Sequence, residues 1–250
     1  MQTLQKLCNT GVVAFLLTFV GGSMPVPSHA AAYPSPAVTL EAAVPEKAPA
    51  ETGESSMFDA AGWARVTLGG IDRAVFALAL ESAERAVERG EADPPTLTVI
   101  DFSRPSTEPR MWVIDLRTRE LLFEEHVSHG RNSGHNVPTA FSNEEGSYKS
   151  SLGLFRAAEG YYGKHGYSLR LDGLEKGIND RARDRAIVVH GADYVNPAIA
   201  RQQGRLGRSL GCPAVRPAIT RQLIDAVKDG GLLFAYYPDP AWLNASTYLN

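Results

Sequence analysis

Cys212 and His190 are two residues of this chain that together fit covalent chemistry. Cys212 lies near the end of the segment Arg205–Val215, and His190 follows the apolar run Ile187–Val189. The thiolate is the reactive form of cysteine, and an unperturbed thiol has a pKa of about 8.5, so it needs help from a nearby base. If both segments end strands that face each other, Cys212 is a nucleophile and His190 is its base.

The residues beside Cys212 support a nucleophile. Gly211 allows the backbone to approach a substrate carbonyl closely, and Pro213 disfavours a helical conformation at Cys212. Because Pro213 has no N–H, an oxyanion hole here would use the amides of Leu210, Gly211 and Cys212 to stabilise a tetrahedral intermediate. A tight structural turn is the alternative for these residues, and a core histidine held by a backbone carbonyl is the alternative for His190.

The cysteine count bears on the same question. Cys8 and Cys212 are the two cysteines of the sequence, and Cys8 lies within a segment that resembles an export signal. Removal of that segment leaves Cys212 as a lone thiol, which cannot form a disulfide within the chain. A lone cysteine in an exported protein is an inert buried residue, an intermolecular crosslink or a reactive nucleophile.

The first residues have the features of a secretory signal. Lys6 supplies a positive charge, Gly11–Val20 is a short apolar run, and Ser28–Ala30 and Ala30–Ala32 place small residues at the cleavage spacing. The apolar run is about half as long as a helix that spans a bilayer. We therefore expect an exported protein of the periplasm or cell envelope, with no transmembrane segment in the mature chain.

Composition divides the rest of the chain. Residues 33–56 are rich in Pro and Ala and predict a flexible spacer. Apolar residues at three- and four-residue spacings predict an amphipathic helix over 69–88, which Gly90 ends. We expect a signal peptide at 1–32, a Pro/Ala-rich linker at 33–56, an N-terminal helical segment at 57–94 and a catalytic domain at 95–250.

The segment from residue 95 onward predicts a mainly β (α+β) domain with a few flanking helices. We expect strands at 96–100, 111–116, 121–127, 150–156, 167–171, 185–189 and 232–237, the second and third forming a hairpin. A helix fits 217–228, with Pro217 in its first turn and two glycines beyond its end. Glycine-rich loops are expected at 130–134 and 160–166.

The overall charge argues against nucleic-acid partners. The 250 residues carry a formal net charge of -3, whereas nucleic-acid-binding domains usually have a basic field. The alternating charges at 180–185 indicate a solvated turn. No phosphate loop or dinucleotide fingerprint is present in the sequence, so we expect no cofactor.

Histidines other than His190 offer two alternatives. His126, His129 and His135 form a cluster of a kind that can bind zinc. The first two face opposite sides of a straight strand, and no carboxylate or cysteine completes the set, so we expect no metal. His165 is an alternative base, although its loop and tyrosines would instead serve to cover a substrate groove.

The motifs around His190 and Cys212 resemble those of a known protein family. His190-Gly191 followed by Ser209-Leu210-Gly211-Cys212 resembles the signature of the YkuD-type L,D-transpeptidases of bacterial cell walls, in particular the murein L,D-transpeptidase catalytic-domain subgroup. The resemblance covers about residues 95–238. Further supporting stretches are Asp101–Ser103, Val113–Leu116, His129–Gly134, Phe141–Asn143, Ser150–Gly153, Ala192–Tyr194 and Gly207–Arg208. It implies an L,D-transpeptidase-like β-sandwich or mixed sheet with flanking helices and an N-terminal helix.

The resemblance also implies a reaction. Cys212 would attack the carbonyl that precedes the terminal D-alanine of a peptidoglycan stem peptide, His190 would shuttle the proton, and the Gly191 carbonyl would orient the imidazole. Attack of a second stem peptide on the thioester would form a 3–3 crosslink, whereas water would make an L,D-carboxypeptidase. A non-catalytic cell-wall-binding protein is a further alternative. We expect a monomer whose partners are stem peptides.

The chain departs from the commoner family pattern at two positions. Leu210 stands where the pattern has histidine, and Ala214 stands where it has arginine. Substrate anchoring would then depend on Arg205, Arg208 or Arg216. We expect the substrate to contact Arg208, Ser209 and Tyr194.

Overall fold

The computed structural model describes residues 56–250. The expected signal peptide, and all but the last residue of the expected linker, lie outside the described residues, so both stay predictions. Within the described part of the chain, no helix is long and apolar enough to cross a membrane.

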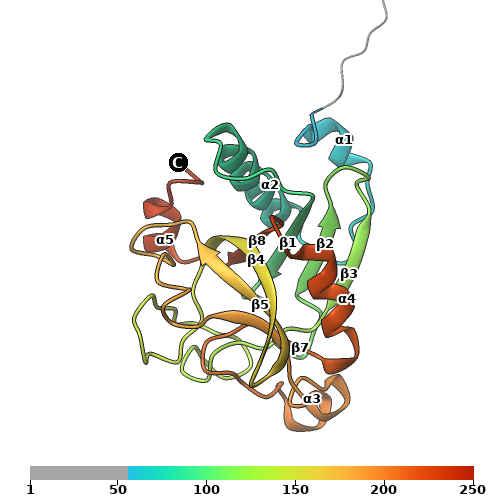
Figure 1. Ribbon diagram of the computed structural model, residues 1–250. Helices are drawn as coiled ribbons and strands as arrows, with labels where there is room; N and C mark the ends of the chain where they lie inside the picture. Colours follow the sequence, from blue (N-terminus) through green and yellow to red (C-terminus); the bar gives the residue numbers. More distant parts are fainter. Residues whose placement is uncertain (1–55) are drawn as a thin grey trace, which may run out of the picture. The chain divides into compact units, whose positions relative to one another are not determined.

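One mixed sheet forms the centre of the fold (Figure 1). Its order is β3-β2-β1-β8-β4-β5-β6-β7, with β1 parallel to β8, β6 parallel to β7 and the other neighbours antiparallel. This confirms the mainly β fold with a mixed sheet and a few helices. The strands are β1 Thr96–Asp101, β2 Met111–Asp115, β3 Leu121–Glu125, β4 Gly153–Gly163, β5 Gly166–Gly173, β6 Val188–Gly191, β7 Ala214–Val215 and β8 Leu232–Tyr236.

The helices lie around this sheet. They are α1 Ala60–Ala64, α2 Arg73–Glu88, α3 Pro197–Gln203, α4 Pro217–Val227 and α5 Pro240–Ala245. Helix α2 packs on β1 and β8, and α4 packs on β6 and β5. Helix α2 begins later than the periodicity predicts because the Asp72 carboxylate accepts hydrogen bonds from the amides of Ala74 (2.7 Å) and Val75 (3.3 Å), which makes Asp72 the N-cap.

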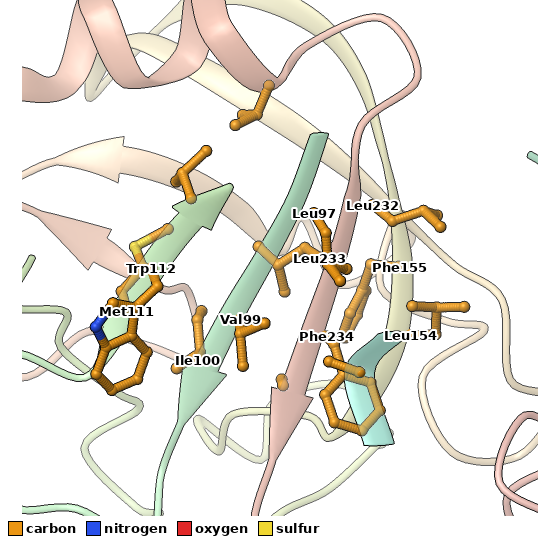
Figure 2. Packing of buried hydrophobic residues seen from close by; sticks show 14 of the residues in the cluster. Leu97, Val99, Ile100, Met111, Trp112, Leu154, Phe155, Leu232, Leu233 and Phe234 are labelled. Atoms are coloured by element: carbon orange, nitrogen blue, oxygen red, sulfur yellow. The ribbon is translucent and has the colours of Figure 1, made fainter. Parts of the chain in front are cut away.

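The hydrophobic core is centred on β1, all of whose residues are buried. Figure 2 shows side chains of β1, β2, β4 and β8 packed against one another. Trp63, Leu68 and Phe76 belong to the same buried cluster. The N-terminal helical segment therefore shares one hydrophobic core with the sheet.

The bounds of several expected segments differ from the structure. The strand expected at 150–156 starts at Gly153. The loop expected at 160–166 is wrong in part: β4 continues to Gly163, and Tyr161 and Tyr162 pair with Ser168 and Tyr167 of β5. The strand preference of tyrosine prevails over the glycines beside it, so only the tip of this hairpin turns. The strand expected to start at residue 185 starts at Val188, because a turn at Arg183–Ala186 precedes it.

Glu175 and Asn179 form a buried polar link between β4 and α5. One Glu175 carboxylate oxygen accepts from the Leu154 amide (2.7 Å), and the other accepts from the Trp242 indole (3.4 Å). The Asn179 amide nitrogen donates to the carbonyls of Leu152 (2.9 Å) and Leu154 (3.0 Å). Burial raises the pKa of Glu175. This link fixes the position where β4 enters the sheet.

We expect Asn179→Asp to lower the free energy of unfolding by about 2–4 kcal/mol, because it removes the donors of two buried carbonyls and adds a buried charge. Denaturant unfolding measures the change. The matched control is Gln202→Glu, the same amide-to-acid change at an exposed position of α3, which should leave stability nearly unchanged. Equal stability of both variants would contradict the assigned role of the Asn179 amide.

Candidate active site

The structure brings Cys212 and His190 to one cleft of about 350 Å³. His190 lies in β6, and its register partner in the parallel pairing with β7 is Ala214. Cys212 precedes Ala214 by two residues, so the thiol stands at the entrance to β7 beside the strand that carries the imidazole. The short ladder between β6 and β7 thus joins two segments that are distant in sequence.

His190 is buried and oriented by a neighbouring carbonyl. His190 is 2% exposed, and its Nδ1 lies 2.9 Å from the carbonyl oxygen of Gly191. Since a carbonyl accepts, Nδ1 carries the proton, which leaves Nε2 as the basic nitrogen. Burial lowers the pKa of His190, with the Gly191 carbonyl opposing that effect. The arrangement keeps His190 neutral and able to accept a proton.

Burial raises the pKa of the Cys212 thiol, which by itself disfavours the thiolate. Four groups oppose that effect: the backbone of Val188, the guanidinium of Arg185, the ammonium of Lys164 and the backbone of Cys212 itself. The sulfur lies 3.6 Å from the carbonyl oxygen of Ala186. The thiol is therefore protonated at rest and depends on nearby groups for activation.

Ser209 shapes the loop that presents Cys212. Its hydroxyl donates to the Cys212 carbonyl (2.6 Å) and accepts from the Gly211 amide (3.1 Å). The Gly211 amide is thus already engaged and is not a free donor in this structure, whereas the expected oxyanion roles of the Leu210 and Cys212 amides stay predictions. The Ser209 hydroxyl likewise serves the loop in this structure, although the residue lines the cleft.

Gly211 occupies a backbone conformation that favours glycine. Its φ is +130°, where other residues are strained. The space is also tight, because a Cβ built on Gly130 would lie 3.0 Å from the Gly211 Cα. Ser150 locks this contact by accepting from the Gly130 amide (3.0 Å) and donating to the Gly211 carbonyl (3.1 Å). The conformation of the cysteine loop is therefore fixed by backbone packing.

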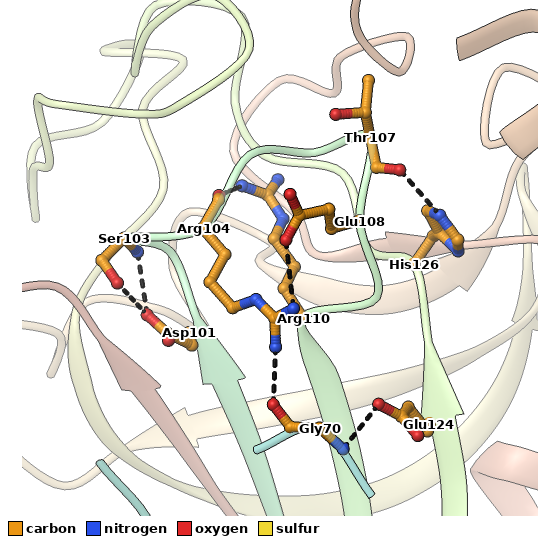
Figure 3. Close-up of polar contacts among 9 residues, drawn as sticks. All are labelled: Gly70, Asp101, Ser103, Arg104, Thr107, Glu108, Arg110, Glu124 and His126. Carbon is orange, nitrogen blue, oxygen red and sulfur yellow. Dashed lines mark hydrogen bonds and ion pairs between the residues drawn. The ribbon is translucent and has the colours of Figure 1, made fainter. Parts of the chain in front are cut away.

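A buried arginine, Arg110, supports the loop that contains Cys212 through His129. Arg110 is 0% exposed and donates to the Val127 carbonyl (2.8 Å), the Arg104 carbonyl (2.9 Å) and His129 Nδ1 (2.8 Å). Burial lowers the pKa of Arg110 to about 9, and burial beside Arg110 lowers the pKa of His129 to about 3. The carbonyl of His129 in turn accepts from the Ser209 amide (2.9 Å). Figure 3 shows Arg110 among the polar contacts of the β1–β2 loop.

The histidine cluster of the sequence has structural partners. His129 accepts from Arg110, and His126 Nε2 lies 3.2 Å from the Thr107 carbonyl oxygen (Figure 3). Among residues 56–250, no group of three or more His, Cys, Asp or Glu side chains is arranged to hold a metal ion.

The three arginines considered for substrate anchoring lie in different places. Arg216 forms a two-point ion pair with Glu125 (2.6 and 2.8 Å), which makes it a structural residue outside the cleft. Arg205 donates to the Leu206 carbonyl (2.9 Å) and does not line the cleft. Arg208 does line it, and Nη1 donates to the carbonyls of Arg131 (3.0 Å) and Gly134 (2.8 Å).

Arg185 lines the cleft, although its sequence context predicted a solvated turn. Burial lowers the pKa of Arg185, and Cys212 opposes that effect. The guanidinium is held by the Ser142 carbonyl (2.6 Å), Ser151 Oγ (2.5 Å), Ser147 Oγ (3.2 Å) and the Lys149 carbonyl (2.7 Å). Its place three residues before β6, the strand that carries His190, is the one signal in the sequence.

The tip of the β4–β5 hairpin covers the imidazole. The ring of His165 stacks on that of His190, with 4.3 Å between centroids and 21° between planes. Tyr194 lines the same cleft, and burial raises the pKa of its hydroxyl to about 12. His165 thus lies within the site, as a neighbour of the imidazole on a strand hairpin.

A second cleft of about 670 Å³ adjoins the first. The two share Lys164, His165 and Tyr194 in their walls, and the second adds Asp193 and Arg221. The hairpin tip and Tyr194 therefore form a wall common to two openings.

Residues 68–236 match the sequence profile of the L,D-transpeptidase catalytic domain. Solved structures similar to this chain include an L,D-transpeptidase from Mycobacterium smegmatis, with 16% identity over 57% of this chain and 59% of that chain and a TM-score of 0.36. L,D-transpeptidase 1 of Mycobacterium tuberculosis has 15% identity over 57% of this chain and 62% of that chain, with a TM-score of 0.33. An L,D-transpeptidase from Xylanimonas cellulosilytica has 13% identity over 64% of this chain and 77% of that chain, with a TM-score of 0.35. The chain spans about three fifths of the length of the first. No curated protein sequence is significantly similar to it.

We expect Lys164→Gln to slow alkylation of Cys212 by iodoacetamide about two- to fivefold at neutral pH. Loss of this cation raises the pKa of the thiol, and below that pKa the rate follows the thiolate fraction, so the pH–rate curve moves to higher pH. Mass spectrometry of the adduct gives the rate. Lys176→Gln, at an exposed position outside the cleft, is the control, and identical curves for both variants would contradict the assigned electrostatics.

Proposed function

The chain belongs to the L,D-transpeptidase catalytic domain family, and from this premise we propose that it is a cysteine transpeptidase acting on the stem peptides of peptidoglycan. Family membership confirms the resemblance carried by the histidine and cysteine motifs. The matched region begins at residue 68 and so includes α2, whereas the resemblance carried by the motifs begins at about residue 95. The observation that carries the proposal is the meeting of Cys212 and an oriented His190 in one cleft.

The first step is acylation of the thiol. Nε2 of His190 takes the proton of Cys212, and the sulfur attacks the carbonyl carbon between the third residue of the stem peptide and the terminal D-alanine. The C–S bond forms first and gives a tetrahedral intermediate. The intermediate collapses as the C–N bond breaks, and His190 returns the proton to the leaving amine of D-alanine. A thioester on Cys212 remains, and no nucleotide is consumed because one amide replaces another.

The backbone supplies the charge stabilisation for this step. The amides of Leu210 and Cys212 are the remaining oxyanion donors, because the Gly211 amide is held by Ser209. Loss of one such donor typically costs 10²–10³ in rate. The rigid Gly130–Gly211 contact supports their role, since a preorganised donor needs no rearrangement as negative charge develops.

The second cleft supports transfer over hydrolysis. It shares Lys164, His165 and Tyr194 with the cleft of the thiol and also contains Asp193, whose carboxylate suits the amine of an acceptor peptide. That amine attacks the thioester, His190 accepts its proton, and the thiolate leaves to give a 3–3 crosslink. Attack by water in place of the amine makes the carboxypeptidase product, and product analysis separates the two.

Export is part of this proposal. The charged, apolar and small-residue pattern of residues 1–32 supports it, and the peptidoglycan substrate lies outside the cytoplasm. The spacer predicted at 33–56 would separate the signal from the folded part.

We expect the wild-type protein to release D-alanine from a tetrapeptide stem, and we expect Cys212→Ala to reduce this release to background. A carbapenem should form a covalent adduct on Cys212 of the folded wild type and none on the variant, as measured by intact-mass spectrometry. Wild-type protein that binds isolated cell wall but neither releases D-alanine nor forms the adduct would instead support a non-catalytic wall-binding protein.

A separate pair of variants assigns the base. His190→Asn should lower kcat by about 10²–10⁴, because it removes the proton acceptor. His165→Phe keeps an aromatic ring against His190 and should retain most of the activity. His135→Asn, at an exposed position outside the cleft, controls for the loss of a histidine. A larger loss in His165→Phe than in His190→Asn would make His165 the base.

A further inference from the structure

We propose that Tyr162, with Tyr167 and Arg221 beside it, forms a tyrosine platform that binds a neutral N-acetylated sugar ring of the peptidoglycan glycan strand. This inference rests on the proposed function, which supplies the acceptor, and it names the part of the acceptor that packs on this platform in the second cleft. It is argued from the exposure of one tyrosine, from the contacts that hold its ring, and from the charges around it.

Tyr162 is unusually exposed for an aromatic residue. It is 70% exposed, the largest fraction among the exposed large hydrophobic side chains of residues 56–250. It lies next to the tip of the β4–β5 hairpin and lines the second cleft, of about 670 Å³. Covering this ring with a ligand is favourable, because it removes a flat apolar surface from water.

The ring of Tyr162 is held in one orientation. Tyr162 and Tyr167 are cross-strand partners in the β4–β5 pairing, and their ring centroids lie 5.1 Å apart. The Arg221 guanidinium, from α4, lies over both rings, 5.8 Å from the Tyr162 centroid and 5.0 Å from the Tyr167 centroid, and it donates to the Tyr162 hydroxyl. A ring that is both exposed and fixed loses little conformational freedom when a ligand packs on it.

Tyr167 is in turn fixed by α4. Its hydroxyl donates to the Asp225 carboxylate (2.8 Å) and accepts from the Lys228 ammonium (3.3 Å). Gly160 makes room for it, because a Cβ built there would lie 2.6 Å from the Tyr167 hydroxyl oxygen. A scattered exposed apolar side chain needs no explanation. Here, however, three elements of the fold hold one aromatic ring at the wall of a cleft, which is the arrangement of a binding surface.

The charges around the tyrosine platform favour a neutral ligand. The cysteine cleft is lined by Lys164, Arg185 and Arg208 and by no Asp or Glu. The second cleft shares Lys164, and its other charged residues are one acid and one base, Asp193 and Arg221. A pyranose has C–H groups on its face, which pack on an aromatic ring, and hydroxyl and acetamido groups at its edge, which bond to such acids and bases. A neutral sugar therefore suits the second cleft, whereas an anion is drawn to the first.

The position of the platform fits the sugar of an acceptor. The two clefts share Lys164, His165 and Tyr194 in their walls, so the second cleft is continuous with the site of the thioester. Each stem peptide of peptidoglycan is attached to a sugar of the glycan strand. An acceptor peptide in the second cleft therefore brings its sugar with it, and Tyr162 gives that sugar a surface on which to pack.

The test is a two-dimensional NMR titration of labelled wild-type protein with two probes. One is a hexamer of β-1,4-linked N-acetylglucosamine, which has no peptide, and the other is a free tetrapeptide stem, which has no sugar. We expect the hexamer to shift the signals of Tyr162, Tyr167 and Arg221. Tyr162→Ala should raise the Kd of the hexamer about three- to tenfold, because it removes the stacked ring, whereas Tyr162→Phe keeps the ring and should stay within about twofold of wild type.

The matched control is Leu122→Ala, which removes an exposed apolar side chain of β3 outside both clefts and should leave the Kd unchanged. Thermal unfolding shows whether the variants fold, and the shifts in the wild type locate the hexamer without any variant. The inference would be overturned by absence of hexamer binding, by shifts confined to other surfaces, or by an unchanged Kd in Tyr162→Ala.

The tetrapeptide separates this inference from a peptide-binding surface. Shifts at Tyr162 caused by the tetrapeptide and not by the hexamer would make the platform a peptide site and overturn the inference. Release of D-alanine is measured independently of the titration. Release without hexamer binding would overturn the inference alone, whereas hexamer binding at Tyr162 without release would overturn the proposed function and leave a sugar-binding platform with no acceptor role.

Discussion

The parallel pairing of β6 with β7 is the constraint on which the site depends. The ladder is short, with His190 opposite Ala214 and Gly191 opposite Val215. It is extended by Ser128, whose amide donates to the Ala214 carbonyl (2.9 Å). Because the thiol and the imidazole come from these two segments, a slip of one residue in the pairing would turn the imidazole to the other side of the sheet. The supports around β7 therefore serve the chemistry as much as the fold.

Those supports come from backbone and buried side chains of several segments. The cysteine loop is held by Ser209 and Ser150, which bond to the main chain around Gly211, and by the close approach of Gly130. Arg110 fixes His129, whose carbonyl holds the Ser209 amide. A buried arginine without a carboxylate in contact is costly unless other groups accept from it, and here two carbonyls and the His129 imidazole do. The hydrogen bonds of Arg110 hold the segments around the cysteine loop in place, and an apolar side chain has no donors to form them.

The sequence was sufficient for the parts of this structure that follow local rules. Apolar alternation placed most of the strands, and the spacing of apolar residues with Pro217 placed α4. It was not sufficient for the hairpin tip, because Tyr161 and Tyr162 gain their strand pairing from β5 and not from their neighbours. Arg185 was misjudged for a similar reason: its charged neighbours indicated a solvated turn, whereas its partners are loop oxygens about 35–45 residues away. Side-chain partners at such separations leave no pattern in a single sequence.

The departures from the commoner motif can be understood from the same geometry. Leu210 removes an imidazole from the cysteine loop, yet the cleft still holds a second imidazole, because the β4–β5 hairpin stacks His165 on His190. Ala214 stands where the commoner motif has an arginine; it is fully buried and is the ladder partner of His190. Arg208, from the opposite side of the cysteine, and Arg185, from the turn before β6, supply positive charge to the cleft instead. A cleft wall is assembled from several segments, so a function can move from one segment to another when its charge and reach are preserved. For this chain, the identity of the residue beside the cysteine therefore constrains the chemistry less than the set of side chains that the sheet brings to the cleft.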